Sequence, residues 1–360
     1  RDILDELGRV LLPFNGNVGG GHVETFLERS RKCLLNLAPA LRDRSALGHV
    51  KRVHGDLHLR NLLLIDGKPV LFDALEFDER LATCDVLYDL AFLLMDLCHR
   101  RLVRQANITM NAYLLEATGA EDAGLSALPL FMSVRAAIRA MVLLQTDQAT
   151  GQTGASIEEA RLYLVQAVAS LDRSTPALIT VGGISGTGKT VLARDVAAGI
   201  GPCPGAVHLR TDTERKSAAS HVDYASTARG AIYERMFARA ATLLAAGRSV
   251  VLDGTFLEER HRMVAEELAS RAGVTFHGLW LTAPERVLLE RVSARQGDAS
   301  DADAEVVRTQ CALAGPNVTS QYWSTIDAGG TIQKTRAAAK ATLESVLGTL
   351  GDGTDEPRPF

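Results

Sequence analysis

Apolar stretches of two kinds alternate along the second half of the chain. Longer segments, such as 191–200 and 228–247, repeat apolar residues at helical spacing. Between them lie short, nearly continuous apolar runs of the kind found in buried strands, at 177–183, 206–211, 249–254 and 274–281. Strands that alternate with helices in this order form a parallel sheet covered by helices. The pattern therefore predicts an α/β domain.

The first half of the chain has mainly helical spacing of its apolar residues. Such spacing indicates amphipathic helices, here within 24–47, 86–118 and 129–145. The exception is 61–75, where the pair Asp66-Gly67 separates two apolar runs. An Asp-Gly pair in that position favours a tight β-hairpin turn. We therefore expect two domains: a mainly α-helical part, followed by the α/β part with its parallel sheet.

A break in the pattern separates the two parts. A polar, glycine-containing stretch at 146–153 precedes a helical segment, and the sequence Asp-Arg-Ser-Thr-Pro at 172–176 ends that segment. A chain of 360 residues is also more typical of two domains than of one. The predicted organisation is a first domain at 1–172, a second domain at 173–350 and a flexible tail at 351–360.

Composition narrows the class of protein. Hydrophobic residues make up 46% and charged residues 23%, which is ordinary for a globular protein and argues against a disordered or collagenous chain. The net charge of −4 gives no general reason to expect nucleic-acid binding. No apolar run reaches the ~18–20 residues of a membrane span, and no signal peptide is visible. We expect a cytoplasmic protein without a membrane partner.

The segment 183–190 reads Gly-Ile-Ser-Gly-Thr-Gly-Lys-Thr and lies between a predicted strand and a predicted helix. It matches G-x-x-x-x-G-K-[ST], a loop whose backbone N–H groups approach phosphate oxygens. In this pattern Lys189 reaches the β- and γ-phosphates and the Thr190 hydroxyl binds Mg²⁺. A glycine-rich turn without a ligand is the alternative. The predicted cofactors are ATP and Mg²⁺, and the predicted binding residues are Gly183, Ser185, Gly186, Thr187, Gly188, Lys189 and Thr190.

Two acidic residues follow later strands, at the end of the sheet where α/β proteins bind ligands. Asp212 is the candidate general base and substrate contact, and Arg215, three residues on, is suited to an anionic group of the substrate. The alternative is a helix cap and a solvated arginine. Asp253 ends the strand at 249–253 and is a candidate Mg²⁺ ligand, with a structural turn as the alternative.

A helical segment at 285–295 carries three arginines and precedes a polar, acidic stretch. This arrangement resembles a lid that closes over the γ-phosphate and excludes water. Arg291 and Arg295 are the candidate catalytic residues because arginines at i and i+4 share one helix face. An exposed helix with ordinary ion pairs is the alternative, since Glu290 and Glu305 are near in sequence.

Taken together, the phosphate loop, the Asp212 element, the strand ending in Asp253 and the arginine-bearing segment resemble the P-loop kinases of small molecules and polynucleotides. This superfamily includes gluconate kinases, zeta-type toxins and polynucleotide 5′-kinases. The resemblance covers the predicted second domain. It implies that Asp212 activates the acceptor hydroxyl, that Arg215 contacts the substrate, and that Arg291 and Arg295 are lid arginines.

The first half has its own phosphoryl-transfer pattern. Asp56 follows His-Gly, Asn61 comes five residues later, and Asp73 follows across the predicted hairpin. In this pattern Asp56 is the base, and Asn61 and Asp73 hold the metal. A chance match and a structural hairpin are the alternative. With the later Asp85 and Asp89, these residues resemble the aminoglycoside phosphotransferase family of protein-kinase-like enzymes.

That fold also needs a strand-rich lobe that clamps the nucleotide with a glycine-rich loop and a lysine. The residues before His54 offer Lys32 in a helical segment, Lys51 beside the catalytic loop, and a glycine-rich stretch at 15–21 without flanking strands. We therefore expect only the C-lobe here, with little transfer of its own. Because the chain opens with Arg1, we expect a truncated two-kinase protein. A pseudokinase-like remnant is the alternative.

The domain order resembles bacterial fusions of an aminoglycoside phosphotransferase-like domain with a P-loop kinase-like domain. The leading hypothesis is an ATP- and Mg²⁺-dependent kinase that phosphorylates an alcohol group of a small molecule in its second domain. A regulatory nucleotide-binding module that controls the kinase-like domain is the second hypothesis. Polynucleotide 5′-phosphorylation is the third, and the balanced charge of the second half disfavours it, so nucleic acid is not the expected partner.

Overall fold

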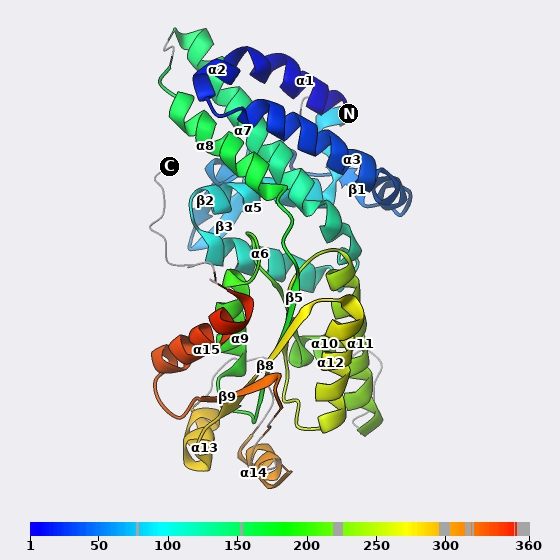
Figure 1. Cartoon of the computed structure of the whole chain (residues 1–360), viewed down its shortest axis with the longest axis vertical. Helices are drawn as coiled ribbons and strands as arrows, with labels where there is room; N and C mark the ends of the chain where they lie inside the picture. The colour runs from blue at the N-terminus through cyan, green and yellow to red at the C-terminus, as the bar shows by residue number, and fades with distance from the viewer. Residues whose placement is uncertain are drawn as a thin grey trace. The chain divides into compact units, whose positions relative to one another are not determined.

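The computed structural model divides into two compact units (Figure 1). Unit 1 comprises Arg1–Ala106 and Gly124–Arg173, and unit 2 comprises Asn107–Ala123 and Ser174–Gly353. The structure describes residues 1–76, 79–151, 154–218, 226–294, 303–313, 318, 320–348 and 350. The predicted boundary at residue 172 falls beside the limit at Arg173, but a short earlier segment belongs to unit 2.

Unit 1 is mainly helical, as the sequence predicts. Its longer helices are α1 (Asp2–Leu11), α3 (His22–Ala46), α5 (Val86–His99), α7 (Leu128–Thr150) and α8 (Ile157–Ser170), and α6 (Val103–Glu116) starts in this unit. Its short elements are η1 (Leu12–Phe14), α2 (Asn15–Val18), β1 (Val50–Arg52), η2 (Leu59–Asn61), β2 (Leu62–Ile65), β3 (Lys68–Leu71), α4 (Glu79–Ala82), β4 (Thr83–Asp85) and η3 (Ala123–Ala127). The predicted hairpin is confirmed, because β2 and β3 pair antiparallel across Asp66-Gly67.

One helical stretch of the described chain passes a membrane-span test of length and apolarity. It runs from Ala123 to Thr150, and 67% of its most apolar window is buried inside the structure. This corrects the expectation that no apolar segment reaches such a length. Burial of this kind is also what a core helix shows, because a helix that is apolar on all sides packs within a protein core.

Unit 2 is an α/β domain with five parallel strands in the order β6-β7-β5-β8-β9. Its strands are β5 (Ala177–Gly183), β6 (Val207–Arg210), β7 (Val250–Asp253), β8 (Thr275–Thr282) and β9 (Trp323–Asp327). Its helices are α9 (Lys189–Gly199), α10 (Thr211–Ala218), α11 (Ser226–Ala245), α12 (Glu259–Ala272), α13 (Glu285–Ser293), α14 (Ala304–Leu313) and α15 (Ile332–Leu347). Four strands match the predicted runs, and β9 is an addition, because its alternating polar residues do not form an apolar run.

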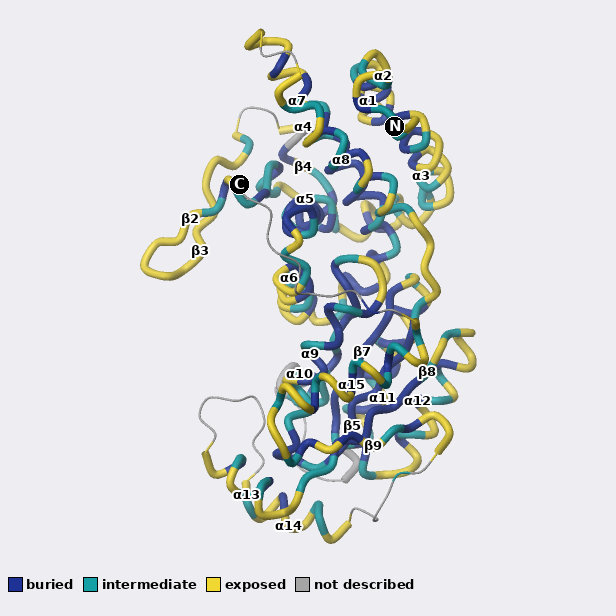
Figure 2. The backbone as a smooth tube through the Cα atoms, turned by 60° about the vertical axis from the view of Figure 1, so that its left-hand side comes forward, coloured by how far each residue is buried: buried dark blue, intermediate teal, exposed yellow. Residues whose placement is uncertain are grey.

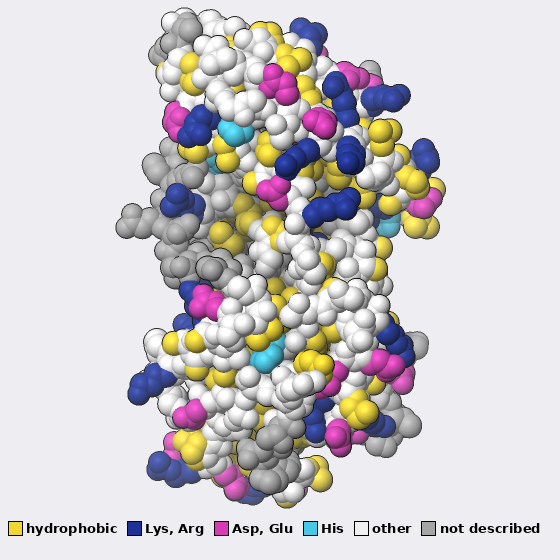
Figure 3. Space-filling model, in the orientation of Figure 1, with side chains coloured by type: hydrophobic (Ala, Val, Ile, Leu, Met, Phe, Trp, Pro, Cys, Tyr) yellow, Lys and Arg dark blue, Asp and Glu magenta, His cyan; other side chains and the backbone are white. Residues whose placement is uncertain are grey.

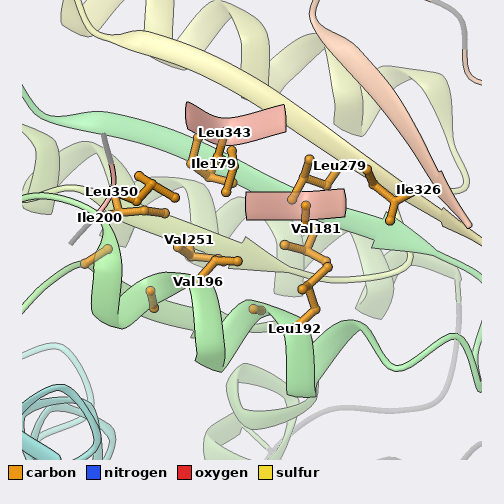
Figure 4. Packing of buried hydrophobic residues seen from close by; sticks show 14 of the residues in the cluster. Ile179, Val181, Leu192, Val196, Ile200, Val251, Leu279, Ile326, Leu343 and Leu350 are labelled. Carbon is orange, nitrogen blue, oxygen red and sulfur yellow. The ribbon is translucent and has the colours of Figure 1, made fainter. Parts of the chain in front are cut away.

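The core of unit 2 explains its apolar pattern. The central strand β5 is buried at all seven residues, as expected for a parallel strand covered on both faces (Figure 2). On one face, Ile179 and Val181 of β5 pack in a cluster with Leu192 of α9 and Leu343 of α15 (Figure 4). On the other face, α11 and α12 lie against the sheet. This packing fixes the carboxyl ends of the strands, where the candidate site lies.

The outer edge of β6 is held by side chains of α6. Asn107 Nδ2 donates hydrogen bonds to Pro204 O at 2.8 Å and Ala206 O at 2.9 Å, and Asn111 Oδ1 accepts from His208 N at 2.7 Å. An edge strand otherwise presents unpaired backbone groups. Both asparagines belong to unit 2, so this unit contains a segment, Asn107–Ala123, that precedes the predicted boundary.

We expect Asn111→Ala to destabilise unit 2 by about 1–3 kcal/mol, because His208 N loses its acceptor in a buried place. The chain's two tryptophans, Trp280 and Trp323, both lie in unit 2, so urea unfolding followed by tryptophan fluorescence reports on this unit alone. Ile108→Ala is the control, since Ile108 is 43% exposed on the same helix. Equal free energies of unfolding for the two variants would contradict the prediction.

Candidate functional site

The loop 183–190 joins the central strand directly to a helix. Strand β5 ends at Gly183 and α9 begins at Lys189, with Gly188 as its N-cap residue. Gly183 has φ of 134°, and a Cβ there would lie 2.4 Å from the carbonyl oxygen of Leu281, so no other residue fits. Gly188 has φ of 88°, which also favours glycine. The loop therefore presents backbone N–H groups at a helix N-terminus, where anions bind.

Lys189 and Thr190 are the first two residues of α9. Lys189 Nζ donates to Ile184 O at 3.0 Å, and Thr187 Oγ1 donates to the same carbonyl at 2.8 Å. Thr190 Oγ1 donates to Asp253 Oδ2 at 2.7 Å. Two oxygen donors this close fit the preference of Mg²⁺ for oxygen ligands in a tight octahedron. Thr190 and Asp253 are therefore suited to hold the metal together.

Asp253 is buried at the end of β7 among cationic neighbours. Its Oδ2 lies 3.4 Å from His208 Nε2 and 3.4 Å from Arg210 Nε. Burial by itself would raise the pKa of the Asp253 carboxyl. His208 contributes most to the opposite effect, followed by the charge of Lys189 and the hydroxyl of Thr190, and the pKa lies below its ordinary value of 3.8. The carboxylate is therefore ionised and available as a metal ligand at neutral pH.

We expect the stabilisation from Asp253 to be present above pH 4 and to be lost as the pH falls through the folded-state pKa, because that pKa is depressed. At neutral pH, Asp253→Asn should lower the free energy of unfolding by about 3 kcal/mol, since it leaves buried cations without their anion. The difference from the wild type should shrink in acid. Urea unfolding at several pH values measures it, with exposed Glu267→Gln as the control. Parallel pH curves for wild type and Asp253→Asn would contradict the prediction.

Asp212 and Arg215 lie on α10, which begins directly where β6 ends. The Asp212 side chain is 30% exposed, and its Oδ1 lies 3.6 Å from Arg215 Nη2. On the other side, Asp212 Oδ2 lies 3.9 Å from Arg210 Nη2. The carboxylate is thus flanked by two guanidinium groups and still reaches solvent. It can accept a proton from a hydroxyl group that binds beside it.

A single cleft joins these predicted residues. It has a volume of about 520 Å³, including the solvent at its mouth, and its lining brings the phosphate loop together with both strand-end carboxylates. Its lining residues are Ser185, Gly188, Lys189, Thr190, Val191, Thr211, Asp212, Asp253, Gly254 and Thr255. The arrangement places a phosphate-binding loop, a metal-binding pair and a candidate base around one space.

Of the two predicted lid arginines, the structure describes Arg291, which does not line this cleft. Arg291 of α13 donates to Ala328 O at 2.8 Å and to Gly330 O at 3.0 Å, and it is not among the residues that line the cleft. Arg295 lies outside the described residues. From the neighbouring helix α14, Gln310 Oε1 accepts a hydrogen bond from Ser185 N of the phosphate loop at 2.8 Å. The catalytic role of Arg291 stays a prediction.

The candidate site of unit 1 is partly assembled. Asn61 Nδ2 donates to Asp56 O at 3.0 Å and to Asp56 Oδ2 at 3.1 Å. His58, with Nε2 3.3 Å from Asp56 Oδ2, is the main cause that lowers the pKa of Asp56, and Asn61 adds to it. Buried Asp89 supports the loop that carries Asp56, because Asp89 Oδ1 accepts a hydrogen bond from Gly55 N at 2.8 Å.

Asp73 does not join that pair in this structure. It is exposed after β3, and no contact of the described residues links it to Asp56 or Asn61. Within the described part of the chain, no group of three or more His, Cys, Asp or Glu side chains could hold a metal ion. The metal-binding roles of Asn61 and Asp73 stay predictions.

Sequence reasoning missed several residues around the cleft. His208 and Arg210 stand two positions apart on β6, which places them on one face of the strand, toward Asp253. That alternation was visible in the sequence. Gln310 carried no such signal, because its contact with Ser185 joins residues 125 positions apart.

Two family models match separate parts of the chain. The model described as "Phosphotransferase enzyme family" matches residues 18–125, and the model described as "AAA domain" matches residues 178–316. The chain therefore combines an aminoglycoside phosphotransferase-like domain with a P-loop kinase-like, ATP-binding domain. The predicted resemblance is confirmed.

Relatives and solved structures give further comparisons. An uncharacterized protein of Mycobacterium bovis and another of Mycobacterium tuberculosis are each 32% identical over 266 residues, which is 70% of this chain and 52% of theirs. The chain thus spans about half the length of these curated relatives. A gluconokinase from Sinorhizobium meliloti 1021 is 20% identical, with a TM-score of 0.39, over 49% of this chain and 95% of its own. The APS kinase of Mycobacterium tuberculosis, in complex with AMPPNP and APS, is 19% identical, with a TM-score of 0.36, over 47% of this chain and 98% of its own.

Proposed function

We propose that unit 2 transfers the γ-phosphoryl group of ATP to an alcohol group of a small molecule, in a reaction that depends on Mg²⁺. The observation that carries this proposal is the cleft in which Lys189, Thr190, Asp253 and Asp212 converge. A phosphate loop alone would also suit a motor or a switch. An ionised carboxylate that reaches solvent beside the loop is what a kinase adds, because the acceptor hydroxyl must lose its proton.

Each residue of the cleft has its own role in the proposed reaction. The loop amides and Lys189 Nζ bind the phosphates, and Lys189 exchanges its bond to Ile184 O for phosphate oxygens. Thr190 and Asp253 hold Mg²⁺, which neutralises charge on the phosphates. Asp212 takes the proton from the acceptor hydroxyl while the oxygen of that hydroxyl attacks the γ-phosphorus. ADP leaves with the electron pair of the bond that breaks. Arg215, beside Asp212, orients an anionic group of the acceptor.

Unit 1 contributes less to this proposal. Asp56 would act as its base and Asn61 and Asp73 as its metal ligands, in a domain that binds Mg²⁺ or substrate weakly. We place the protein in the cytoplasm, with a small molecule as its partner. Acidic and basic side chains are interspersed over the face shown in Figure 3, and this supports a small acceptor over a nucleic-acid strand.

The test is a metabolite extract incubated with the full chain, Mg²⁺ and γ-labelled ATP, then analysed by mass spectrometry. A kinase yields a labelled product whose mass exceeds that of an extract component by HPO₃. Binding of ATP with no such product would overturn the proposal and favour the regulatory module. A labelled product only when DNA or RNA 5′ ends are supplied would favour the polynucleotide kinase.

A further inference from the structure

Two buried carboxylates and a largely buried arginine form a network behind the helix that carries Asp212. Arg239 of α11 donates to Asp122 Oδ2 at 2.8 Å through Nε and to Asp122 Oδ1 at 3.1 Å through Nη2. Its remaining nitrogen, Nη1, donates to Glu214 Oε1 at 2.5 Å. The side chains of Asp122, Glu214 and Arg239 are only 3%, 7% and 16% exposed. All three belong to unit 2.

Glu214 connects this network to the cleft. It lies on α10 between Asp212 and Arg215, and its carboxylate is buried, whereas the side chains of Asp212 and Arg215 are 30% and 41% exposed. Glu214 is also contacted at its backbone, because Arg235 Nη2 donates to Glu214 O. The helix thus has one charged face directed at the solvent-accessible site and one carboxylate anchored in the opposite direction.

The length of α10 makes such an anchor necessary. It has eight residues, and a helix this short is not stable by itself. Its first residue follows directly from β6, so the strand fixes where the helix starts. The strand does not fix the rotation of the helix about its own axis. The hydrogen-bonded ion pair between Glu214 and Arg239 does, because the guanidinium is itself held in a defined orientation by its bidentate pair with Asp122.

The charges and the burial of these residues make the network strong enough to fix the orientation of α10. Burial by itself would lower the pKa of Arg239, but the hydrogen bonds and charges of Asp122 and Glu214 raise it, so the guanidinium stays charged. Two carboxylates face one guanidinium and together form a group with a net negative charge. Glu214 has a second cationic neighbour, Arg235, whose Nε lies 3.9 Å from Glu214 Oε2. Removal of Arg239 would therefore leave Asp122 as a buried anion without this cation, and Glu214 with the longer contact to Arg235. The two carboxylates would repel each other and would be more stable in contact with water, so α10 would rotate or shift to expose them.

We propose that Arg239 is a positioning residue for phosphoryl transfer: through Glu214, and braced by Asp122, it holds α10 so that Asp212 faces the cleft. This rests on the proposed function of Asp212. Asp122 lies 117 residues before Arg239, in the segment that the phosphotransferase family model also covers, so a residue from that match supports the catalytic helix of the P-loop domain.

The experiment compares Arg239→Met and Arg239→Lys with wild type in the full chain, using the acceptor found in the extract assay. We expect Arg239→Met to lower kcat by about 10- to 100-fold, the scale of a misplaced catalytic group. The Kd for Mg²⁺-ATP, measured with a fluorescent ATP analogue, should change less than about 2-fold, because the phosphate loop is untouched. Arg239→Lys keeps the charge and should restore part of kcat.

Arg271→Met is the matched control, since Arg271 pairs with Glu267 on the surface, and it should leave both kcat and Kd at wild-type values. Tryptophan fluorescence shows whether each variant is folded. If Arg239→Met unfolds, Glu214→Ala takes its place, because it removes the carboxylate that accepts the hydrogen bond from Arg239.

Three results separate the positioning role of Arg239 from the proposed kinase function. If wild type transfers phosphate, Asp212→Asn does not, and the folded Arg239→Met or Glu214→Ala variant keeps wild-type kcat, the positioning role is wrong. Equal losses of kcat and nucleotide binding would also overturn it, since they indicate a general loss of structure. If wild type itself forms no product, the proposed kinase function fails first.

Discussion

Replacing Lys189 with alanine should reduce phosphoryl transfer by about 100- to 1000-fold, the scale of removing a group that stabilises charge in a transition state. The lysine is the first residue of α9, and its ammonium group donates a hydrogen bond to a loop carbonyl, Ile184 O. The fold should survive, because the side chain is not part of the buried core. Labelled-product formation at saturating ATP measures the effect.

The control for this prediction is Lys340→Ala. Lys340 lies on α15, where its ammonium is 3.8 Å from Glu344 and its side chain is 45% exposed. It should keep wild-type turnover and the wild-type urea midpoint. If Lys189→Ala retains most of the turnover while folded, the cleft described above is not the site of transfer.

The second large effect is expected for Asp212→Asn. This substitution keeps the size of the side chain and removes its capacity to take a proton, so transfer should fall by about 100- to 10000-fold. Binding of Mg²⁺-ATP should stay within about 2-fold of wild type, because the phosphate loop and the Thr190–Asp253 pair remain.

Steady-state kinetics and equilibrium binding separate these two properties. A kinase needs Asp212 for chemistry, whereas a regulatory module that only binds and slowly hydrolyses ATP does not. Unchanged transfer in Asp212→Asn would therefore exclude Asp212 as the base. Glu267→Gln, an exposed carboxylate on α12, shows the effect of losing a surface charge alone.

The features that the sequence predicted depend either on neighbouring residues or on a general rule of the fold. The phosphate loop is a local pattern, because Gly183 and Gly188 meet steric requirements that glycine alone satisfies. The pairing of Thr190 with Asp253 followed from a general property of parallel sheets, in which strand ends meet at one edge. Asp56 and Asn61 lie five positions apart and were likewise brought together.

Contacts between particular residues that lie far apart in the sequence were not predicted. Arg239 and Asp122 are ordinary charged residues in helical segments, and nothing in their spacing marks them as partners. For Arg291, a helix-face argument gave a direction but not an acceptor, and in the structure it donates to the loop carbonyls of Ala328 and Gly330. The strand β9 was missed because half-buried strands lack a continuous apolar run.

The two asparagines of α6 limit how freely this chain could be divided or recombined. Helix α6 begins in unit 1 and continues into unit 2, where Asn107 and Asn111 satisfy the backbone of β6. A P-loop domain excised at residue 173 would carry a bare strand edge, open to pairing with other chains and to aggregation. The two domains are therefore not interchangeable cassettes, and an exchange of the second domain among relatives would have to carry residues 107–123 with it.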